Sequence, residues 1–361
     1  MKAKAILAVA VVAALACGAA MGQTHAPWPE DWNNRNDPAL WVTVGNAGNA
    51  GEWSGVSYGG YGPNRICGAV SYEYNIGTYE VTAGQYTAFL NAVAGVDTYA
   101  LYNTNMWLDG YGCKIERYAG SGTAGNPYQY RVAADWANRP VNYVSWGDSV
   151  RFANWLTNGQ GNGSTETGAY NLNSAMTDAQ LMAVVVPSAG QRATWSTGTK
   201  PYFLLTSEDE WHKAAYHKND GATGNYFDYP TSSNSVPSND LTNPDGGNNA
   251  NFNQSGYTID SPYRRTEAGE FELSDSPYGT FDQGGNVWEW NEALVGSSRG
   301  LRGGSFHSDG YYLRAWGRSD NYGPTAESGG LGFRVSQVPE PATLSLLALG
   351  GLAMIRRRGK K

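Results

Sequence analysis

Glycine is the residue that most constrains the fold of this chain. The sequence of 361 residues contains 47 glycines, about twice the usual frequency. A glycine in a helix interior costs about 1 kcal/mol, so a helical bundle is disfavoured. The glycines show no three-residue period, which excludes a collagen-like fibre. Because 41% of the residues are hydrophobic and 13% are aromatic, the chain has enough apolar surface to fold. We therefore predict a globular domain with an aromatic core and many tight turns.

The N-terminus has the features of a secretory signal peptide. Lys2 and Lys4 precede an apolar run over residues 5–16, which small residues follow. We predict a signal peptide over residues 1–22, with cleavage after Gly22, and hence an exported protein. Cys17 offers an alternative as a lipoprotein cysteine, although Ala14 fits that signal poorly.

The C-terminal residues 337–361 combine three features in a fixed order. Pro-Glu-Pro at residues 339–341 is followed by an apolar stretch over residues 342–355 and a basic tail. The apolar stretch is shorter than the ~20 residues that span a bilayer. The order resembles the PEP-CTERM sorting signal of Gram-negative bacteria, from which an exosortase removes the tail. An ordinary tail anchor with flanking positive charge is the alternative.

The resemblance to a sorting signal implies a location and a processing partner. The protein would be exported to the cell envelope, the cell surface or the extracellular matrix. It would meet an exosortase, and it would meet the membrane only through its transient C-terminal segment.

Removal of both ends makes the chain more acidic. The loss of seven basic residues and one acidic residue leaves 18 basic and 31 acidic residues, a net charge of −13 instead of −7. This charge argues against nucleic acid and anionic membrane surfaces as partners and is compatible with cation binding. Cys67 and Cys113 remain in the mature chain, where they could form a disulfide or stay as buried thiols. The sequence leaves both alternatives open.

Three helices are predicted from capping residues that precede apolar positions at helical spacing. The pairs are Thr82 with Gln85, Ser145 with Asp148, and Ser207 with Glu210. Residues 177–186 fit either a short helix or a strand. Strands are expected near residues 70–76, 287–290, 301–306 and 332–335. We place the Gly- and Asn-rich residues 23–69 in a separate N-terminal segment and the main domain at residues 70–336.

Six segments, in order, resemble one known family. They are YEVTAGQYTAFLN at 79–91, PVNYVSW at 140–146 running into FANWL at 152–156, LTSEDEW at 205–211, GNVWEW at 285–290, LRGGSF at 301–306, and GFRV at 332–335. Together they resemble the formylglycine-generating enzyme, or sulfatase-modifying factor, family. The resemblance implies a single α+β domain of the C-type-lectin type, rich in loops and with little regular secondary structure.

The resemblance does not extend to the catalytic cysteines. In the oxidase members, two cysteines after Gly-Gly-Ser bind copper(I), which soft thiolates suit, and oxidise a substrate cysteine to formylglycine. Residues 306–313 of this chain contain no cysteine, and Cys67 and Cys113 lie far upstream. Copper is therefore not expected, and we predict that the copper-dependent oxidation is absent.

The remaining groove residues can still be named from the resemblance. Trp288 and Ser305 match pocket residues of the oxidase members, and His307 and Asp309 enter the former active-site segment. Arg314 belongs to a matching Arg-x-x-x-Arg-Ser pattern. These five residues are our candidates for lining a groove without its redox centre.

Calcium is the metal that the resemblance implies. Residues 282–289 match a family site formed by the side chains of Asp282 and Glu289 and the carbonyls of Gly285 and Val287. These are the hard oxygen ligands that Ca²⁺ prefers. A glycine turn that enters a strand is the alternative. A second, more divergent set consists of Asn251, the Phe252 carbonyl, Asp260 and a carbonyl near Pro262.

The sequence thus predicts an exported, non-catalytic, calcium-stabilised module that binds a protein or glycan ligand. One alternative is an enzyme: a formylglycine-generating oxidase, or another oxidoreductase that uses His307 and Asp309 in the same groove. A structural component of an extracellular matrix is the third possibility.

Overall fold

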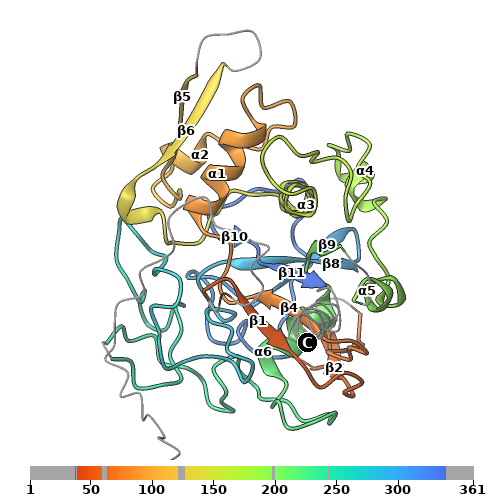
Figure 1. Cartoon of the computed structure of the whole chain (residues 1–361). Coiled ribbons are helices and arrows are strands. Elements are labelled where there is room, and N and C mark those ends of the chain that lie inside the picture. Colours follow the sequence, from red (N-terminus) through yellow and green to blue (C-terminus); the bar gives the residue numbers. More distant parts are fainter. Residues whose placement is uncertain are drawn as a thin grey trace, which may run out of the picture.

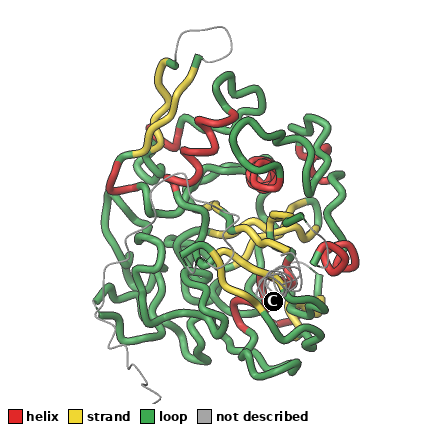
Figure 2. Tube along the Cα trace, in the orientation of Figure 1, coloured by secondary structure: helices red, strands yellow, loops and turns green. Residues whose placement is uncertain are grey.

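The computed structural model describes residue 37 and residues 39–58, 63–120, 127–196, 200–242 and 244–338. The predicted signal peptide lies outside these residues, as does the sorting segment from residue 339 onwards. Within the described ranges, no helix has the length and hydrophobicity needed to cross a membrane. Loops connect short helices and strands throughout (Figures 1 and 2).

The regular elements follow one another in this order. They are β1 (Trp41–Val44), β2 (Glu52–Ser54), η1 (Val56–Tyr58), β3 (Arg65–Cys67), β4 (Tyr74–Gly77), α1 (Ala83–Val93), α2 (Asn105–Leu108), β5 (Ile115–Ala119), β6 (Tyr128–Val132), η2 (Ala134–Trp136), α3 (Trp146–Thr157), α4 (Asp178–Met182), α5 (Ala189–Trp195), β7 (Tyr202–Leu205), α6 (Glu208–Tyr216), β8 (Trp288–Val295), β9 (Ser298–Arg302), β10 (Leu331–Gly332) and β11 (Val335–Val338). The prefix η marks 3₁₀-helices.

The largest sheet joins the two ends of the domain. Its four strands are antiparallel and lie in the order β1-β4-β11-β7. Trp41 pairs with Gly77, and Ser336 of the last strand pairs with Ile76. Residues 41–44 are therefore an edge strand of the main sheet, so residue 70 does not mark a structural boundary. The pairing of this strand with β4 buries the side chains of Trp41 and Val44, which favours its place in the sheet.

A second sheet carries the motifs of the C-terminal third. β8 lies between β10, to which it is parallel, and β9, to which it is antiparallel. Strands thus form in all three C-terminal regions where the sequence predicted them, although β9 ends at Arg302 rather than Phe306. Two separate hairpins, β2–β3 and β5–β6, complete the strands, and β5–β6 extends away from the body of the domain (Figure 1).

All three capping boxes are confirmed. At the start of α1, the Thr82 hydroxyl accepts the Gln85 N–H at 3.3 Å, and the Gln85 side chain accepts the Thr82 N–H at 2.8 Å. Helices α3 and α6 begin in the same way. Residues 178–182 form the helix α4, which decides between the two alternatives for that segment.

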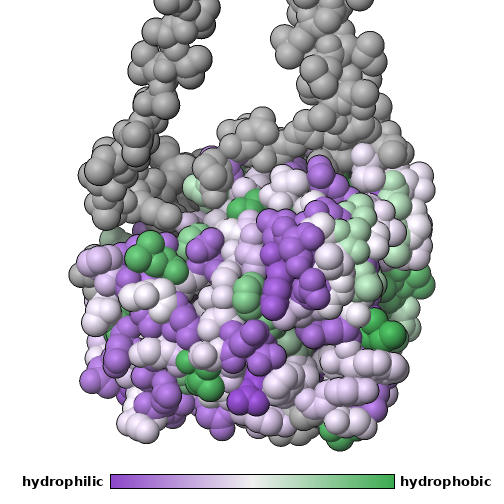
Figure 3. All heavy atoms as spheres, turned by 90° about the horizontal axis from the view of Figure 1, so that it is seen from below, coloured by the Kyte–Doolittle hydropathy of each residue, from purple (hydrophilic) through white to green (hydrophobic). Residues whose placement is uncertain are grey.

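The core is aromatic, as the composition predicted. Phe89 of α1 packs against Phe152 of α3 with ring centroids 5.3 Å apart, and Phe152 lies 5.4 Å from Phe333. Every residue of α3 is buried. On the face seen in Figure 3, hydrophobic residues are scattered among hydrophilic ones. The chain therefore forms an α+β domain with little regular secondary structure.

Candidate functional site

Three of the predicted groove residues come together. Trp288, Ser305 and His307 line one groove with a volume of about 270 Å³. Trp288 is the first residue of β8, whereas Ser305 follows β9. Between β9 and Ser305, two glycines with φ of 92° and 77° reverse the chain. The other lining residues are Ser308, Tyr312, Ser319, Asn321, Tyr322, Ser328, Gly330 and Leu331.

The lining combines aromatic rings with hydroxyl groups. The Trp288 and Tyr312 rings meet edge to face with centroids 5.6 Å apart. The Ser308 hydroxyl accepts the Ser305 N–H at 3.0 Å and lies 3.5 Å from the Ser305 hydroxyl. None of the residues that line this groove is Asp, Glu, Lys or Arg. The groove is therefore polar without carrying a formal charge on its walls.

His307 lies at the rim of the groove within an aromatic cluster. Its Nδ1 is 3.1 Å from the Tyr257 hydroxyl, and its ring centroid is 5.0 Å from that of Tyr111. Burial lowers the pKa of His307, and the neighbouring guanidinium groups of Arg264 and Arg265 lower it further. The imidazole is consequently neutral at neutral pH.

Asp309 and Arg314 do not lie in the groove. The Asp309 carboxylate is exposed and accepts the Tyr311 N–H at 2.9 Å within a turn. Arg314 donates from Nε to the Tyr229 hydroxyl at 2.6 Å and stacks on Trp316. His307, Ser308 and Tyr312 line the groove, whereas Asp309 and Arg314 do not, so membership of one segment did not predict a shared wall.

Cys67 and Cys113 are free and buried, and neither lines the groove. Burial raises the pKa of Cys67 to about 11, and its Sγ accepts a hydrogen bond from Arg302 at 3.2 Å. Cys113 packs in the main hydrophobic core. Of the two alternatives, the buried thiols are confirmed and the disulfide is wrong.

The first predicted calcium set is only partly available to a cation. Glu289 is already paired, since its two oxygens accept Arg334 Nε at 2.7 Å and Nη2 at 2.8 Å. It also accepts Trp211 Nε1 at 2.6 Å. Asp282 accepts one backbone N–H, from Gly269, and burial raises its pKa to about 6. Asp282 therefore remains the better ligand of the two.

The structure adds a residue that sequence reasoning missed. Glu80 is 1% exposed, and neither of its carboxylate oxygens has a hydrogen-bond partner. Burial and the nearby carboxylates of Asp282 and Glu289 raise its pKa well above the usual range. A buried carboxylate without partners requires a proton or a cation. The available signal was the lone acidic residue between Tyr79 and Val81, just before α1.

The carboxylates of Glu80 and Asp282 are the type of oxygen ligand that calcium prefers, but they are too few to complete its coordination. A polar cavity of about 10 Å³, roughly the space of one water molecule, adjoins Asp282, but Glu80, Gly285 and Val287 do not line it. Within the described ranges, no three or more His, Cys, Asp and Glu side chains converge as a metal site. Carbonyl oxygens would have to supply the remaining ligands, which Ca²⁺ accepts.

The structure does not bring the second predicted calcium set together. Asn251 is buried and its Oδ1 has no partner, whereas the Asp260 side chain is 96% exposed. The Phe252 carbonyl accepts the Asn239 amide at 3.1 Å. Pro262 lies in the same exposed loop as Asp260. The loop after Tyr257 thus turns its carboxylate to solvent, away from Asn251.

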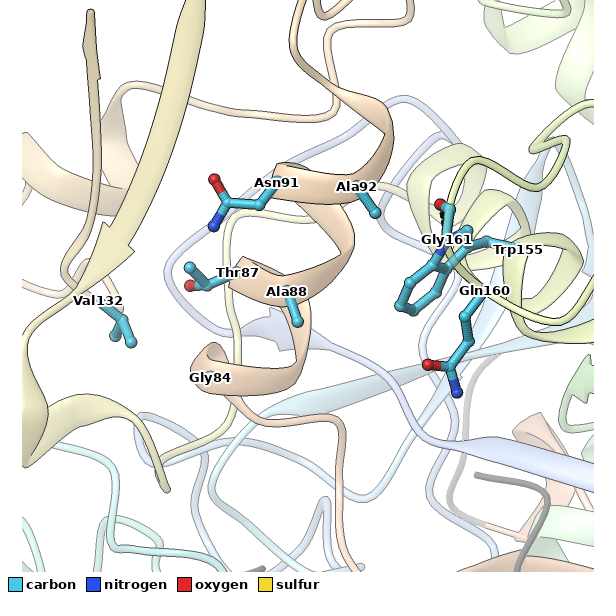
Figure 4. A pocket seen from close by; sticks show the side chains of 9 residues that line it. All are labelled: Gly84, Thr87, Ala88, Asn91, Ala92, Val132, Trp155, Gln160 and Gly161. Atoms are coloured by element: carbon cyan, nitrogen blue, oxygen red, sulfur yellow. Dashed lines mark hydrogen bonds between the residues drawn. The ribbon is translucent and has the colours of Figure 1, made fainter. Parts of the chain in front are cut away.

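A larger groove of about 440 Å³ lies between α1, α3 and β6, and Figure 4 shows the side chains around it. Its wall contains no acid, base or thiol. The Asn91 side chain is engaged by the Tyr130 backbone, and Trp155 Nε1 donates to the Gly161 carbonyl. The polar groups that could orient a ligand are therefore used inside the fold.

A carboxyl pair, the half-buried Glu327 and the buried Asp148, lies next to the groove wall. Glu327 precedes the lining residue Ser328, and its carboxyl group interacts with Asp148 of α3 and with Asn103. Burial and Asp148 raise the pKa of Glu327 to about 8. The pKa of Asp148 is also raised, mainly by burial. One proton shared by this pair would hold the loop against α3.

Glu327→Gln is expected to flatten the pH dependence of the free energy of unfolding between pH 5 and 8. The folded protein keeps the Glu327 proton up to about pH 8, whereas an unfolded carboxyl releases it near 4.5. The stabilisation is thus present at low pH and is lost as the pH rises through this window. Urea unfolding at several pH values measures the slope. Glu116 forms an exposed ion pair with Arg131, so Glu116→Gln should keep the wild-type slope. An unchanged slope in Glu327→Gln would contradict the raised pKa of Glu327.

Comparison with known proteins identifies two regions. Residues 34–338 match the model of the sulfatase-modifying factor enzyme 1-like domain, and residues 337–359 match the PEP-CTERM protein-sorting motif. The motif indicates an exported protein of Gram-negative bacteria that is processed by exosortase-type sorting. No curated protein sequence matches the chain.

Several solved structures are similar to this chain. Treponema denticola variable protein 1 is 18% identical with a TM-score of 0.46, covering 83% of this chain and 95% of that one. CarF is 17% identical with a TM-score of 0.42, covering 83% and 98%. PvdO from Pseudomonas aeruginosa is 18% identical with a TM-score of 0.42, covering 82% and 93%.

The family assignment rests on the match to the domain model, which covers most of the chain and includes the strands and the groove described above. The chain belongs to the family of proteins with a sulfatase-modifying factor enzyme 1-like domain.

Proposed function

We propose that this exported protein binds a ligand in the groove at Trp288, Ser305 and His307 and does not oxidise cysteine. The observation that carries the proposal is the chemistry of the groove wall, which offers aromatic rings and hydroxyl groups but no thiol. The two cysteines of the described chain are buried elsewhere. The cell surface is the proposed location, and retention in an extracellular matrix is the alternative.

The test is a direct assay for the oxidase activity. The full chain is incubated with copper(I), oxygen and a peptide containing Cys-x-Pro-x-Arg, and the peptide mass is followed. We expect the mass to stay that of the cysteine peptide. Formation of formylglycine would overturn the proposal.

We also propose that calcium stabilises this scaffold, which we relate to the C-type-lectin type. Glu80 and Asp282 would supply the carboxylates, and Gly285 and Val287 would supply carbonyl oxygens. Support comes from the unpartnered Glu80 carboxylate and from the excess of negative charge around Arg334. Bound calcium would neutralise these buried charges and would hold the turn that leads into β8.

A chelator is expected to lower the melting temperature of the wild-type protein. A ligand at a hundred times its Kd stabilises the folded state by about 2.7 kcal/mol, so the shift should be easily measured by calorimetry. Asp282→Asn and Glu80→Gln should each remove the response to calcium. Asp260→Asn should retain it, because that side chain is exposed. Equal melting temperatures with calcium and with chelator would contradict the calcium site.

A further inference from the structure

The groove at Trp288 carries no formal charge, although the protein as a whole is acidic. Its lining contains no carboxylate, ammonium or guanidinium group. His307 at the rim has a lowered pKa, and the raised pKa of Glu327 keeps the carboxyl behind the wall protonated at neutral pH. A charged ligand would therefore lose hydration without gaining a counter-charge from the lining.

The volume and the aromatic lining of the groove favour a small ring-shaped group. Its volume of about 270 Å³ lies near the lower limit of small-molecule pockets. Trp288, Tyr312 and Tyr322 contribute flat aromatic surfaces that are partly exposed. Such surfaces bury the C–H face of a ring while leaving polar edges wet.

The polar lining offers groups that both donate and accept hydrogen bonds. Four serines, Asn321 and the tyrosines surround the aromatic faces. The Ser308 hydroxyl accepts one internal N–H and lies at the long distance of 3.5 Å from the Ser305 hydroxyl, and a hydroxyl has one donor proton and two acceptor lone pairs in all. A ligand that carries several hydroxyl groups on an apolar ring matches this combination.

The aromatic surface continues beyond the groove. The ring centroid of the exposed Tyr311 lies 5.4 Å from that of Tyr312. On the side of His307, the exposed Tyr111 lies 5.0 Å from the imidazole. Rings attached to the one in the groove would thus meet further aromatic side chains.

We infer that the groove binds a neutral polysaccharide, with one sugar ring packed against the adjoining Trp288 and Tyr312 rings and neighbouring units on the rim. This inference rests on the proposed function, since it names the ligand of the same groove. Glycosidic cleavage normally requires a pair of carboxyl groups, and the lining has none. The structure therefore points to binding without hydrolysis.

The experiment measures retention of the full chain on immobilised polysaccharides. The neutral probes are dextran, galactomannan and xylan; polygalacturonate serves as the acidic probe, and a random peptide library as the protein-like one. We expect retention on at least one neutral probe that changes little between about 0.05 and 0.5 M salt, because screening acts on charges.

Four variants locate the binding site. Trp288→Ala should weaken binding about tenfold or more, as expected for a central aromatic contact. Asn321→Ala changes an exposed rim residue, and Gly330→Ala adds a methyl group 3.2 Å from the Ser305 hydroxyl inside the groove. Both should weaken binding even if Trp288→Ala fails to fold. Trp53→Ala is the matched control, because Trp53 is 52% exposed and lies on β2, outside the groove lining.

The outcomes separate this inference from the proposed function. If the groove variants lose binding to a neutral polysaccharide and Trp53→Ala keeps it, the result supports both this inference and the proposed function. Two results would show that the ligand is not a neutral polysaccharide while leaving the proposed binding groove in place. The first is salt-dependent binding to polygalacturonate alone, and the second is peptide binding that Trp288→Ala abolishes. Neutral binding that survives all groove variants overturns the location. Formylglycine formation overturns the proposed function itself.

Discussion

Arg334→Met is expected to lower the free energy of unfolding by about 3–5 kcal/mol, the cost of breaking a buried ion pair by removing one partner. Arg334 is fully buried and pairs with both oxygens of Glu289. It also donates to the carbonyls of Gly77 and Phe281. The substitution would leave these acceptors unpaired and three carboxylates, those of Glu80, Asp282 and Glu289, without their shared cation.

The loss should depend on pH in a defined direction. Asp282 has a folded pKa of about 6, above its usual 3.8, so lowering the pH through 6 protonates it in the folded state and relieves the repulsion. The cost of Arg334→Met should therefore be smaller at pH 5 than at pH 8. Urea unfolding at both pH values measures it. Arg131→Met, which removes an exposed arginine paired with Glu116, is the control and should change stability little. An equally small loss for Arg334→Met would contradict this role.

Gly285→Ala is expected to destabilise the protein by about 3 kcal/mol or more, because backbone strain and a steric clash act together. Gly285 has a φ of 92°, which disfavours any side chain. A Cβ at this position would also lie well inside contact distance of the Asn251 carbonyl oxygen. That carbonyl accepts the Asn286 N–H at 2.9 Å, so it cannot turn away without losing a hydrogen bond.

A second glycine separates the two causes. Gly296, between β8 and β9, has a φ of 63°, and no atom lies within 4 Å of the place that an alanine methyl group would occupy. Gly296→Ala should therefore cost only the conformational part, about 1–2 kcal/mol. Thermal or urea unfolding of both variants gives the difference between their losses of stability, and this difference is the cost of the steric clash. If both variants lose the same stability, the close approach of Gly285 to Asn251 is not what fixes the turn.

Local elements were predictable because their causes are local. The capping residues Thr82, Ser145 and Ser207 and the apolar positions that follow them specify helix starts without reference to the rest of the chain. The family resemblance named Trp288 and Ser305 as groove residues, and in the structure both line the same groove.

The predictions that failed involved side-chain direction or distant pairing. Asp309 lies two residues from His307, yet its carboxylate forms a turn with Tyr311. Asp260 is exposed while Asn251 is buried. The sequence pattern placed the strand β1 in a separate N-terminal segment, whereas the structure pairs β1 with β4 in the main sheet. The pairing was missed because β4 lies about thirty residues further along the chain and no local signal reports such pairing.

The sequence alone determined the family, the sorting motif, the helix starts and the loss of the cysteines from the groove segment, since each is a property of residue types in order. Only the tertiary structure decided which charges meet. It pairs Arg334 with Glu289, leaves Glu80 buried without a partner and surrounds Trp288 with uncharged groups. These contacts arise between segments brought together by burial of the aromatic core, and the energy of a charge depends on its surroundings in the folded chain.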